Sequence, residues 1–319
     1  MDPVLFAADL AAKPATLRAL ADHLDGSTPW SALPAASRIV FVGMGSSMYA
    51  ASIAAARLRA AGVNAVAELA SSDLLPEPTP GTVVIAVSAG GGSRETKAAV
   101  EHYLQRCPVV LLTNKPESDL ASQVDAVVDM YAGVEEGGVA CRSFQHTLIM
   151  LLALESHLGA SKVDPAGLAR SAASASAHLL ETWRSWLPQT RHLLSGPNGI
   201  HAVAPAHRLS SAAQSALMLR EGPRVNAVAC ETGDWSHVDV YLTKTTDYRM
   251  LLFAGSRWED ELLQWTSERG STIVVVGADL PQAAQSIRYP GDDDSDIALL
   301  SEVLIGELLA SDLWLNKDN

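Results

Sequence analysis

Two short loops rich in glycine and serine carry the residue types in this chain that are best suited to chemistry. The loop 43–47 reads Gly-Met-Gly-Ser-Ser after the apolar run 38–42, and the loop 88–93 reads Ser-Ala-Gly-Gly-Gly-Ser after the run 83–87. Glycine lets a backbone approach an anion closely, its N–H groups can point at the anion, and serine hydroxyls add donors. The two loops therefore predict that one phosphorylated small molecule is held from two sides. The alternative is a pair of glycine-rich turns that only reverse the chain.

Alternating strands and helices should position both loops. Val/Ile-rich runs that are typical of buried parallel strands occur at 38–42, 64–69, 82–88, 108–113 and 126–130. Helical patterns follow at 48–62, 93–106 and 143–158. This alternation predicts βαβ units and a parallel, doubly wound sheet. Loops at the carboxyl ends of such strands, where a helix begins, are the places where α/β folds bind phosphate.

The second half of the chain repeats this architecture in its pattern. Strand-like runs occur at 199–204, 225–229, 249–254 and 272–277, and helical patterns occur at 207–220 and about 296–313. We therefore expect an α/β fold with two tandem, doubly wound parallel-sheet lobes. The expected segments are a helical lead-in, a first domain, a connecting helix and a second domain that ends in a helix, at 1–35, 36–158, 159–194 and 195–319.

Composition excludes several classes of function. The formal charge of −13 and the pI of about 5.1 argue against a nucleic-acid partner, because duplex binding requires clustered Lys and Arg. The longest apolar stretch, 148–154, is too short to span a bilayer. The three cysteines, Cys107, Cys141 and Cys230, lie far apart without metal-ligand spacing, which favours a cytoplasmic protein without disulfides. We expect no metal, no cofactor and no membrane partner.

Several segments resemble, in their order and spacing, the sugar isomerase (SIS) domain family. The chain is similar to the isomerase half of glucosamine-6-phosphate synthase and to stand-alone amino-sugar-phosphate isomerases and deaminases. The resemblance covers the chain from about residue 10 to residue 313 and implies two flavodoxin-like SIS lobes. The matching segments are 43–50, 88–96, 112–114, 139–141, 216–221 and 231–237.

The resemblance implies which residues hold the substrate phosphate. The family's second loop usually reads Ser-Gln-Ser-Gly-Glu-Thr, whereas here Ala89, Gly90 and Gly92 replace the Gln, the second Ser and the Glu. Two side-chain contacts are thereby lost, and backbone N–H groups with the flanking serines remain. The implied phosphate-binding residues are Ser46, Ser47, Ser88, Ala89, Gly90 and Ser93.

The resemblance also assigns acid–base roles. Glu221, expected just past the helix 207–220, falls on the family's catalytic glutamate, and His237 falls on its ring-opening histidine, which in relatives comes from the neighbouring subunit. A carboxylate can take a proton from C2 and return it one carbon away, while histidine can shuttle a proton near neutral pH. Glu136, or its neighbour Glu135, would face the substrate. Cys141 stands where relatives carry a sugar-contacting serine, with a buried inert thiol as the alternative.

Departures from the family leave the reaction open. The chain begins at Met1 without a glutaminase domain, so we expect no glutamine-dependent synthase reaction. It ends at 315–319, where relatives continue into a tail whose lysine can form a Schiff base. Isomerisation or deamination of an amino-sugar 6-phosphate, and dehydration of its N-acetyl form by C2–C3 elimination, both remain as hypotheses. A non-catalytic sugar-phosphate sensor is the alternative, and the family's interfacial site implies a homodimer.

Overall fold

The apolar runs of the first half form a five-stranded parallel sheet, as the sequence predicts. In the computed structural model its strands follow the order β2-β1-β3-β4-β5. This is the flavodoxin-like order, and its switch point lies between β1 and β3. Every residue of β3 and β4 is buried, which explains why these runs are continuously apolar rather than alternating. The strands are β1 (Arg38–Gly43), β2 (Ala65–Leu69), β3 (Thr82–Val87), β4 (Val109–Thr113) and β5 (Ala126–Asp129).

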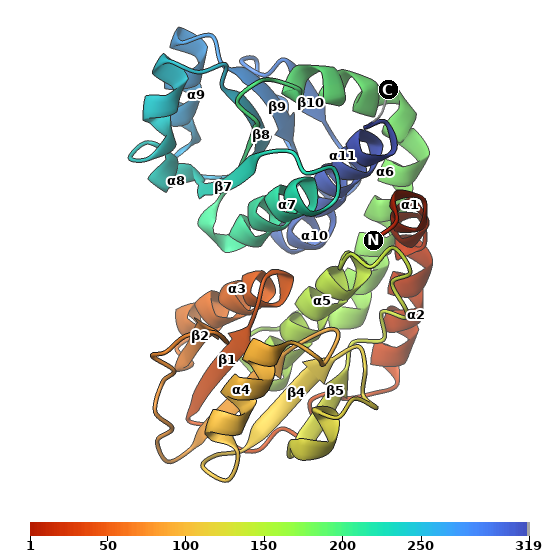
Figure 1. The fold of residues 1–319 in the computed structure, drawn as a ribbon, viewed down its shortest axis with the longest axis vertical. Coiled ribbons are helices and arrows are strands. Elements are labelled where there is room, and N and C mark those ends of the chain that lie inside the picture. Colours follow the sequence, from red (N-terminus) through yellow and green to blue (C-terminus); the bar gives the residue numbers. More distant parts are fainter. Residues whose placement is uncertain (318–319) are drawn as a thin grey trace. The chain divides into compact units, whose positions relative to one another are not determined.

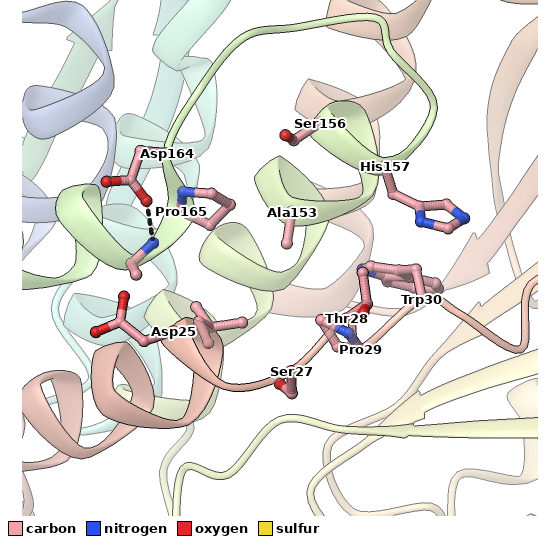
Figure 2. A pocket seen from close by; sticks show the side chains of 12 residues that line it. Asp25, Ser27, Thr28, Pro29, Trp30, Ala153, Ser156, His157, Asp164 and Pro165 are labelled. Carbon is pink, nitrogen blue, oxygen red and sulfur yellow. Dashed lines mark hydrogen bonds between the residues drawn. The ribbon is translucent and has the colours of Figure 1, made fainter.

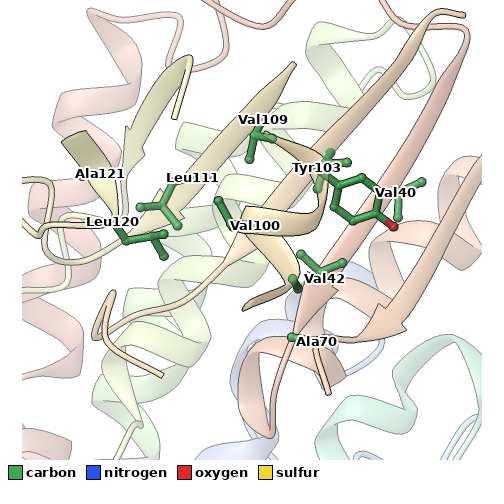
Figure 3. Packing of buried hydrophobic residues seen from close by; sticks show 12 residues of the cluster. Val40, Val42, Ala70, Val100, Tyr103, Val109, Leu111, Leu120 and Ala121 are labelled. Atoms are coloured by element: carbon green, nitrogen blue, oxygen red, sulfur yellow. The ribbon is translucent and has the colours of Figure 1, made fainter. Parts of the chain in front are cut away.

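Helices cover both faces of this sheet (Figure 1). The core between the sheet and α4 gathers alternate strand residues, because side chains two apart on a strand share one face. Figure 3 shows Val40 and Val42 of β1 in the same cluster as Val100 and Tyr103 of α4. The fully buried Tyr103 ring keeps its hydroxyl satisfied by donating to the carbonyl oxygen of Pro76 at 2.9 Å. The helices of this half are α2 (Lys13–Asp25), α3 (Ser46–Ala60), α4 (Arg94–Tyr103) and α5 (Arg142–His157).

The second half builds a second parallel sheet with the same topology. Its order is β10-β9-β8-β6-β7, so its switch point lies between β6 and β8. The strand β10 was not predicted, because it has only three residues and two of them are polar. The predicted α/β fold with two parallel sheets is confirmed. The strands are β6 (Ile200–Ala204), β7 (Ala227–Glu231), β8 (Arg249–Phe253), β9 (Thr272–Val276) and β10 (Gln285–Ile287).

The helices around the second sheet differ in detail from the prediction. The predicted helix 296–313 is two helices, which are separated at Glu302. Asp294 caps the first of them by accepting hydrogen bonds from the N–H groups of Asp296 and Ile297, at 2.8 and 3.0 Å. The helices are α7 (Leu209–Glu221), α8 (Thr232–Trp235), α9 (Glu259–Glu268), α10 (Ser295–Ser301) and α11 (Val303–Leu315), with short 3₁₀ turns at η2 (Ala206–Arg208) and η3 (Asp239–Lys244). A further 3₁₀ turn, η1 (Ala121–Gln123), lies between β4 and β5 of the first sheet.

The chain divides into two units, and the structure describes residues 1–317. One unit comprises Ala15–Glu135 and Ala140–Arg170. The other comprises the N-terminal segment Met1–Pro14 with α1 (Pro3–Ala11), the short loop Glu136–Val139, and the chain from Ser171 onward. The long helix α6 (Pro165–Leu194) contributes to both units. Residues 318 and 319, which the predicted second domain includes, lie outside the described residues.

No helix within residues 1–317 combines the length and the apolar character that crossing a membrane requires.

Candidate functional site

The loop between β1 and α3 leaves the beginning of a helix open at the carboxyl end of a central strand. The strand ends at Gly43, and α3 begins at Ser46 after Gly45, whose φ of 51° suits glycine. A Cβ on Gly43 would lie 3.2 Å from the Ser47 Cβ, so the turn is tight. The N-cap of α3 is Gly45, which has no side chain to cap the helix, and the Ser47 N–H already donates to the Met44 carbonyl oxygen at 3.1 Å. Ser46 and Ser47 are partly exposed there, so their hydroxyl groups and the remaining N–H groups of the first turn lie where an anion would sit.

The loop between β3 and α4 is a fixed turn. The Gly91 N–H donates to the Ser88 carbonyl oxygen at 3.1 Å, and Gly91 has a φ of 60°. A Cβ on Gly91 would lie 2.6 Å from the Ser118 hydroxyl oxygen. Ser93 caps α4, because its hydroxyl oxygen accepts from the Thr96 N–H at 3.0 Å. The loop therefore offers mainly backbone donors, while one predicted phosphate ligand already serves as a helix cap.

Asn114, at the end of β4, joins this turn to the segment that follows β5. Its N–H donates to the Ala89 carbonyl oxygen at 3.1 Å. Its side-chain nitrogen donates to the Gly133 carbonyl oxygen at 2.6 Å, and its side-chain oxygen accepts from the Ala132 N–H at 2.9 Å. The sequence marked this position only as part of a matching segment. The sequence alone does not show that Asn114 connects these two loops, because the connection depends on which strands lie side by side.

The two neighbouring glutamates before α5 have different environments. The Glu135 carboxylate accepts hydrogen bonds from the N–H groups of Cys141, Arg142 and Ser143, at 2.7, 2.6 and 3.1 Å. It therefore caps α5, whereas Glu136 is exposed. Cys141 is fully buried, which favours the inert thiol over a contact with substrate.

The two predicted acid–base residues lie at helix ends around the second sheet. Glu221 is the last residue of α7 rather than just past it, and burial raises the pKa of its carboxyl above the ordinary value. His237 follows α8, is exposed, and donates its N–H to the Asp234 carbonyl oxygen at 2.8 Å. The predicted residues are thus distributed over both units. The phosphate-loop residues and Cys141 belong to one unit, and Glu136, Glu221 and His237 belong to the other.

A cavity of about 440 Å³ lies elsewhere (Figure 2). The end of α2, the loop 27–30, the end of α5 and the beginning of α6 line it, and it contains none of the predicted site residues. Its loop leads into the beginning of β1, which places the cavity at the amino ends of the strands. Ligands of open α/β sheets bind at the carboxyl ends, so we do not assign the site to this cavity.

Among residues 1–317, no three His, Cys, Asp or Glu side chains gather in a way that could hold a metal ion.

Comparisons with known proteins place the first sheet in a family. Residues 32–155, which include both glycine–serine loops, match the SIS domain family. The chain is 26% identical over 211 residues to a glutamine–fructose-6-phosphate aminotransferase (isomerizing) of Sulfolobus acidocaldarius, a match that covers 66% of this chain and 35% of the relative. The curated relatives that match are all much longer, and the chain covers between 12% and 35% of each.

Solved structures share the fold over nearly the whole chain. The C-terminal domain of glucosamine-fructose-6-phosphate aminotransferase from Francisella tularensis has a TM-score of 0.83 at 16% identity, covering 98% of this chain and 96% of that one. Tagatose-6-phosphate ketose/aldose isomerase from Escherichia coli has a TM-score of 0.80 at 16% identity, covering 99% and 94%. At such identities the likeness is one of fold.

Proposed function

We propose that this chain, which carries a SIS domain over residues 32–155, is an enzyme that binds an amino-sugar 6-phosphate and moves protons at its C1, C2 and C3. The observation that carries the proposal is the pair of loops at the carboxyl ends of β1 and β3, on either side of the switch point. The beginning of α3 offers the Ser46 and Ser47 hydroxyls, and the turn 88–91 offers the N–H groups of Ala89 and Gly90, since those of Ser88 and Gly91 donate to the carbonyl oxygens of Leu112 and Ser88. Such donors suit a phosphate.

Glu221 is the proposed general base. Burial raises its pKa, which brings the carboxyl closer to the pH at which it can both accept and return a proton. In isomerisation, Glu221 takes the C2 proton of the open-chain sugar and returns it at C1, and His237 protonates and deprotonates the ring oxygen during opening and closure. In the deaminase variant, isomerisation leaves an imine at C2, and water hydrolyses it to the C2 ketone with release of ammonia.

Elimination is the second reaction that the same residues support. Glu221 removes the C2 proton, the C2–C3 double bond forms, and the C3 oxygen leaves as water after protonation. An N-acetyl group disfavours loss of the nitrogen and leaves the C3 oxygen as the leaving group. The fold is shared with an isomerase, and it does not distinguish the two reactions.

We also propose that the chain works as a homodimer with an active site at the subunit interface. Three apolar residues that follow the exposed His237 closely in the chain are exposed as well, since Val238, Tyr241 and Leu242 are 53%, 62% and 40% exposed. Exposed apolar side chains around a functional residue suit a covered interface. Sedimentation should give a dimer for the native chain and a monomer for Tyr241→Glu, and a native monomer would contradict the interface.

Incubation with glucosamine 6-phosphate and with N-acetylglucosamine 6-phosphate tests the reaction. Ammonia or fructose 6-phosphate would support isomerisation or deamination, and an ultraviolet-absorbing unsaturated product would support elimination. Glu221→Gln should lower turnover by about 10³-fold or more while ligand-induced thermal stabilisation remains. A native protein that is stabilised by these ligands yet converts neither would instead be a sugar-phosphate sensor.

A further inference from the structure

Trp314 covers the backbone directly after Glu221. Gly222 ends α7, and its N–H donates to the Met218 carbonyl oxygen at 3.1 Å. A Cβ on Gly222 would lie 2.7 Å from a ring carbon of Trp314, in the last turn of α11. The indole ring therefore lies against the backbone directly after Glu221, where α7 ends. A ring in this place covers the backbone at the end of α7, where burial raises the pKa of the Glu221 carboxyl.

A second close contact determines how α7 lies on α11. A Cβ on Gly306 of α11 would lie 2.3 Å from the Ser215 hydroxyl oxygen of α7. Glycine at this position lets the two helices approach more closely than larger residues would allow. The helices are thus held together at Gly306 and again at Trp314, so the end of α7 has little freedom to shift.

Phe6 of α1 packs on Trp314 from the N-terminal segment. The two ring centroids lie 6.0 Å apart with the planes inclined at 49°. Phe6 is 1% exposed and Trp314 is partly exposed, so a core phenylalanine packs against an indole that keeps some access to solvent. Aromatic pairs at this separation contribute roughly 1 kcal/mol beyond the area that they bury.

The same N-terminal segment holds the loop 136–139 through two hydrogen bonds and a close backbone contact. The Gly137 N–H donates to the carboxylate of Asp9 at 2.7 Å, and the Gly137 carbonyl oxygen accepts from the Asp2 N–H at 3.1 Å. A Cβ on Gly137 would lie 2.6 Å from the Phe6 Cα, so the loop lies directly on the backbone of α1. This loop carries Glu136, one of the residues predicted to face the substrate.

We infer that Phe6 and Trp314 are positioning residues, which hold Glu221 and the loop 136–139 in one fixed arrangement. All the residues in this chain of contacts belong to the same unit. Neither aromatic ring is assigned a contact with substrate; each acts through the residue that it supports. The inference rests on the proposed role of Glu221, and it makes the N-terminal helix a support for that residue.

Trp314→Ala tests the inference with a measurement that does not need turnover. Carboxyl-carbon NMR, with Glu221→Gln to assign the signal, follows the pKa of Glu221 directly. Removing the ring should admit water and lower that pKa, back toward the ordinary value. If the native enzyme turns over, the acid limb of its kcat/KM profile should move to lower pH, and kcat should fall about tenfold or more while KM changes less than about twofold.

Two further variants separate positioning from general destabilisation. Trp314→Phe should restore the native pKa of Glu221, and Trp265→Ala, which removes an α9 tryptophan packed against the second core, should leave it unchanged. Phe6→Ala should in addition speed amide exchange at 136–139 by about tenfold or more. An unchanged pKa in Trp314→Ala, or an equal shift in Trp265→Ala, would overturn the inference. A shifted pKa in a protein that converts no sugar phosphate would sustain the positioning role and refute the proposed function.

Discussion

Two glutamates of the same unit, Glu302 and Glu221, have raised pKa values but differ in their hydrogen-bond partners and in their exposure. Glu302 is fully buried between α10 and α11, where burial raises its pKa to about 7 although the Arg208 guanidinium, which donates to it, lowers the value. Arg208 also donates to the Ala254 carbonyl oxygen, so Glu302 braces the loop that follows β8. Glu221 is only partly buried and can meet a ligand. A shifted pKa therefore identifies a carboxyl group as a candidate functional residue, and the exposure of its side chain decides whether it can contact a ligand.

Glu302→Gln should change how the free energy of unfolding depends on pH. Because the folded-state pKa is raised above the unfolded value, this carboxyl contributes stability below about pH 4.5, and the contribution is lost as pH rises through about 7. The loss is on the order of 3 kcal/mol or less. Denaturant unfolding of both proteins from pH 4.5 to 8 should show the native free energy falling relative to that of the variant. A constant difference across this range would mean that Glu302 stays ionised.

The positions of most strands and helices can be predicted from the sequence, because local patterns of apolar residues determine them. Apolar runs located nine of the strands to within about two residues. The runs are most continuous where a strand is buried on both faces, as in β3 and β4, whereas β2, β5 and β7 are partly exposed. The break at Glu302 was missed because apolar spacing continues through it, and only the tertiary contact with Arg208 marks it. The same limit applies to the site. The loop glycines are visible in the sequence, but the capping by Glu135 and the brace at Asn114 depend on packing.

Gly91→Ala should distort the turn 88–91, which is proposed to bind the phosphate. Its φ of 60° is costly for alanine, and the added Cβ would meet the Ser118 hydroxyl. We expect a loss of roughly 1 to 2 kcal/mol in unfolding free energy and at least about tenfold weaker binding of sugar phosphate. Gly92→Ala is the matched control for stability, because its Cβ would meet nothing closer than 3.6 Å. Equal effects of the two variants would show that the conformation at position 91 does not shape the turn.

For the whole molecule, the predicted site residues are shared between two units, each with its own sheet and core. The phosphate loops belong to one unit and Glu221 to the other. The proposed phosphate binding and the proposed acid–base role can therefore be tested separately, with two ligands of different size.

Hydrogen exchange with inorganic phosphate and with a sugar phosphate should separate the two contributions. Phosphate should slow amide exchange only in the two loops, at Ser46, Met48, Ala89 and Gly90, because these backbone N–H groups are the proposed anion donors. A sugar phosphate should extend the protection to the end of α7 around Glu221, since the base must approach C2 to act on it. Protection at the loops by both ligands, without any change near Glu221, would leave phosphate binding in place and remove the assigned base. Protection near Glu221 with phosphate alone would argue that the end of α7 responds to the loops rather than to the sugar.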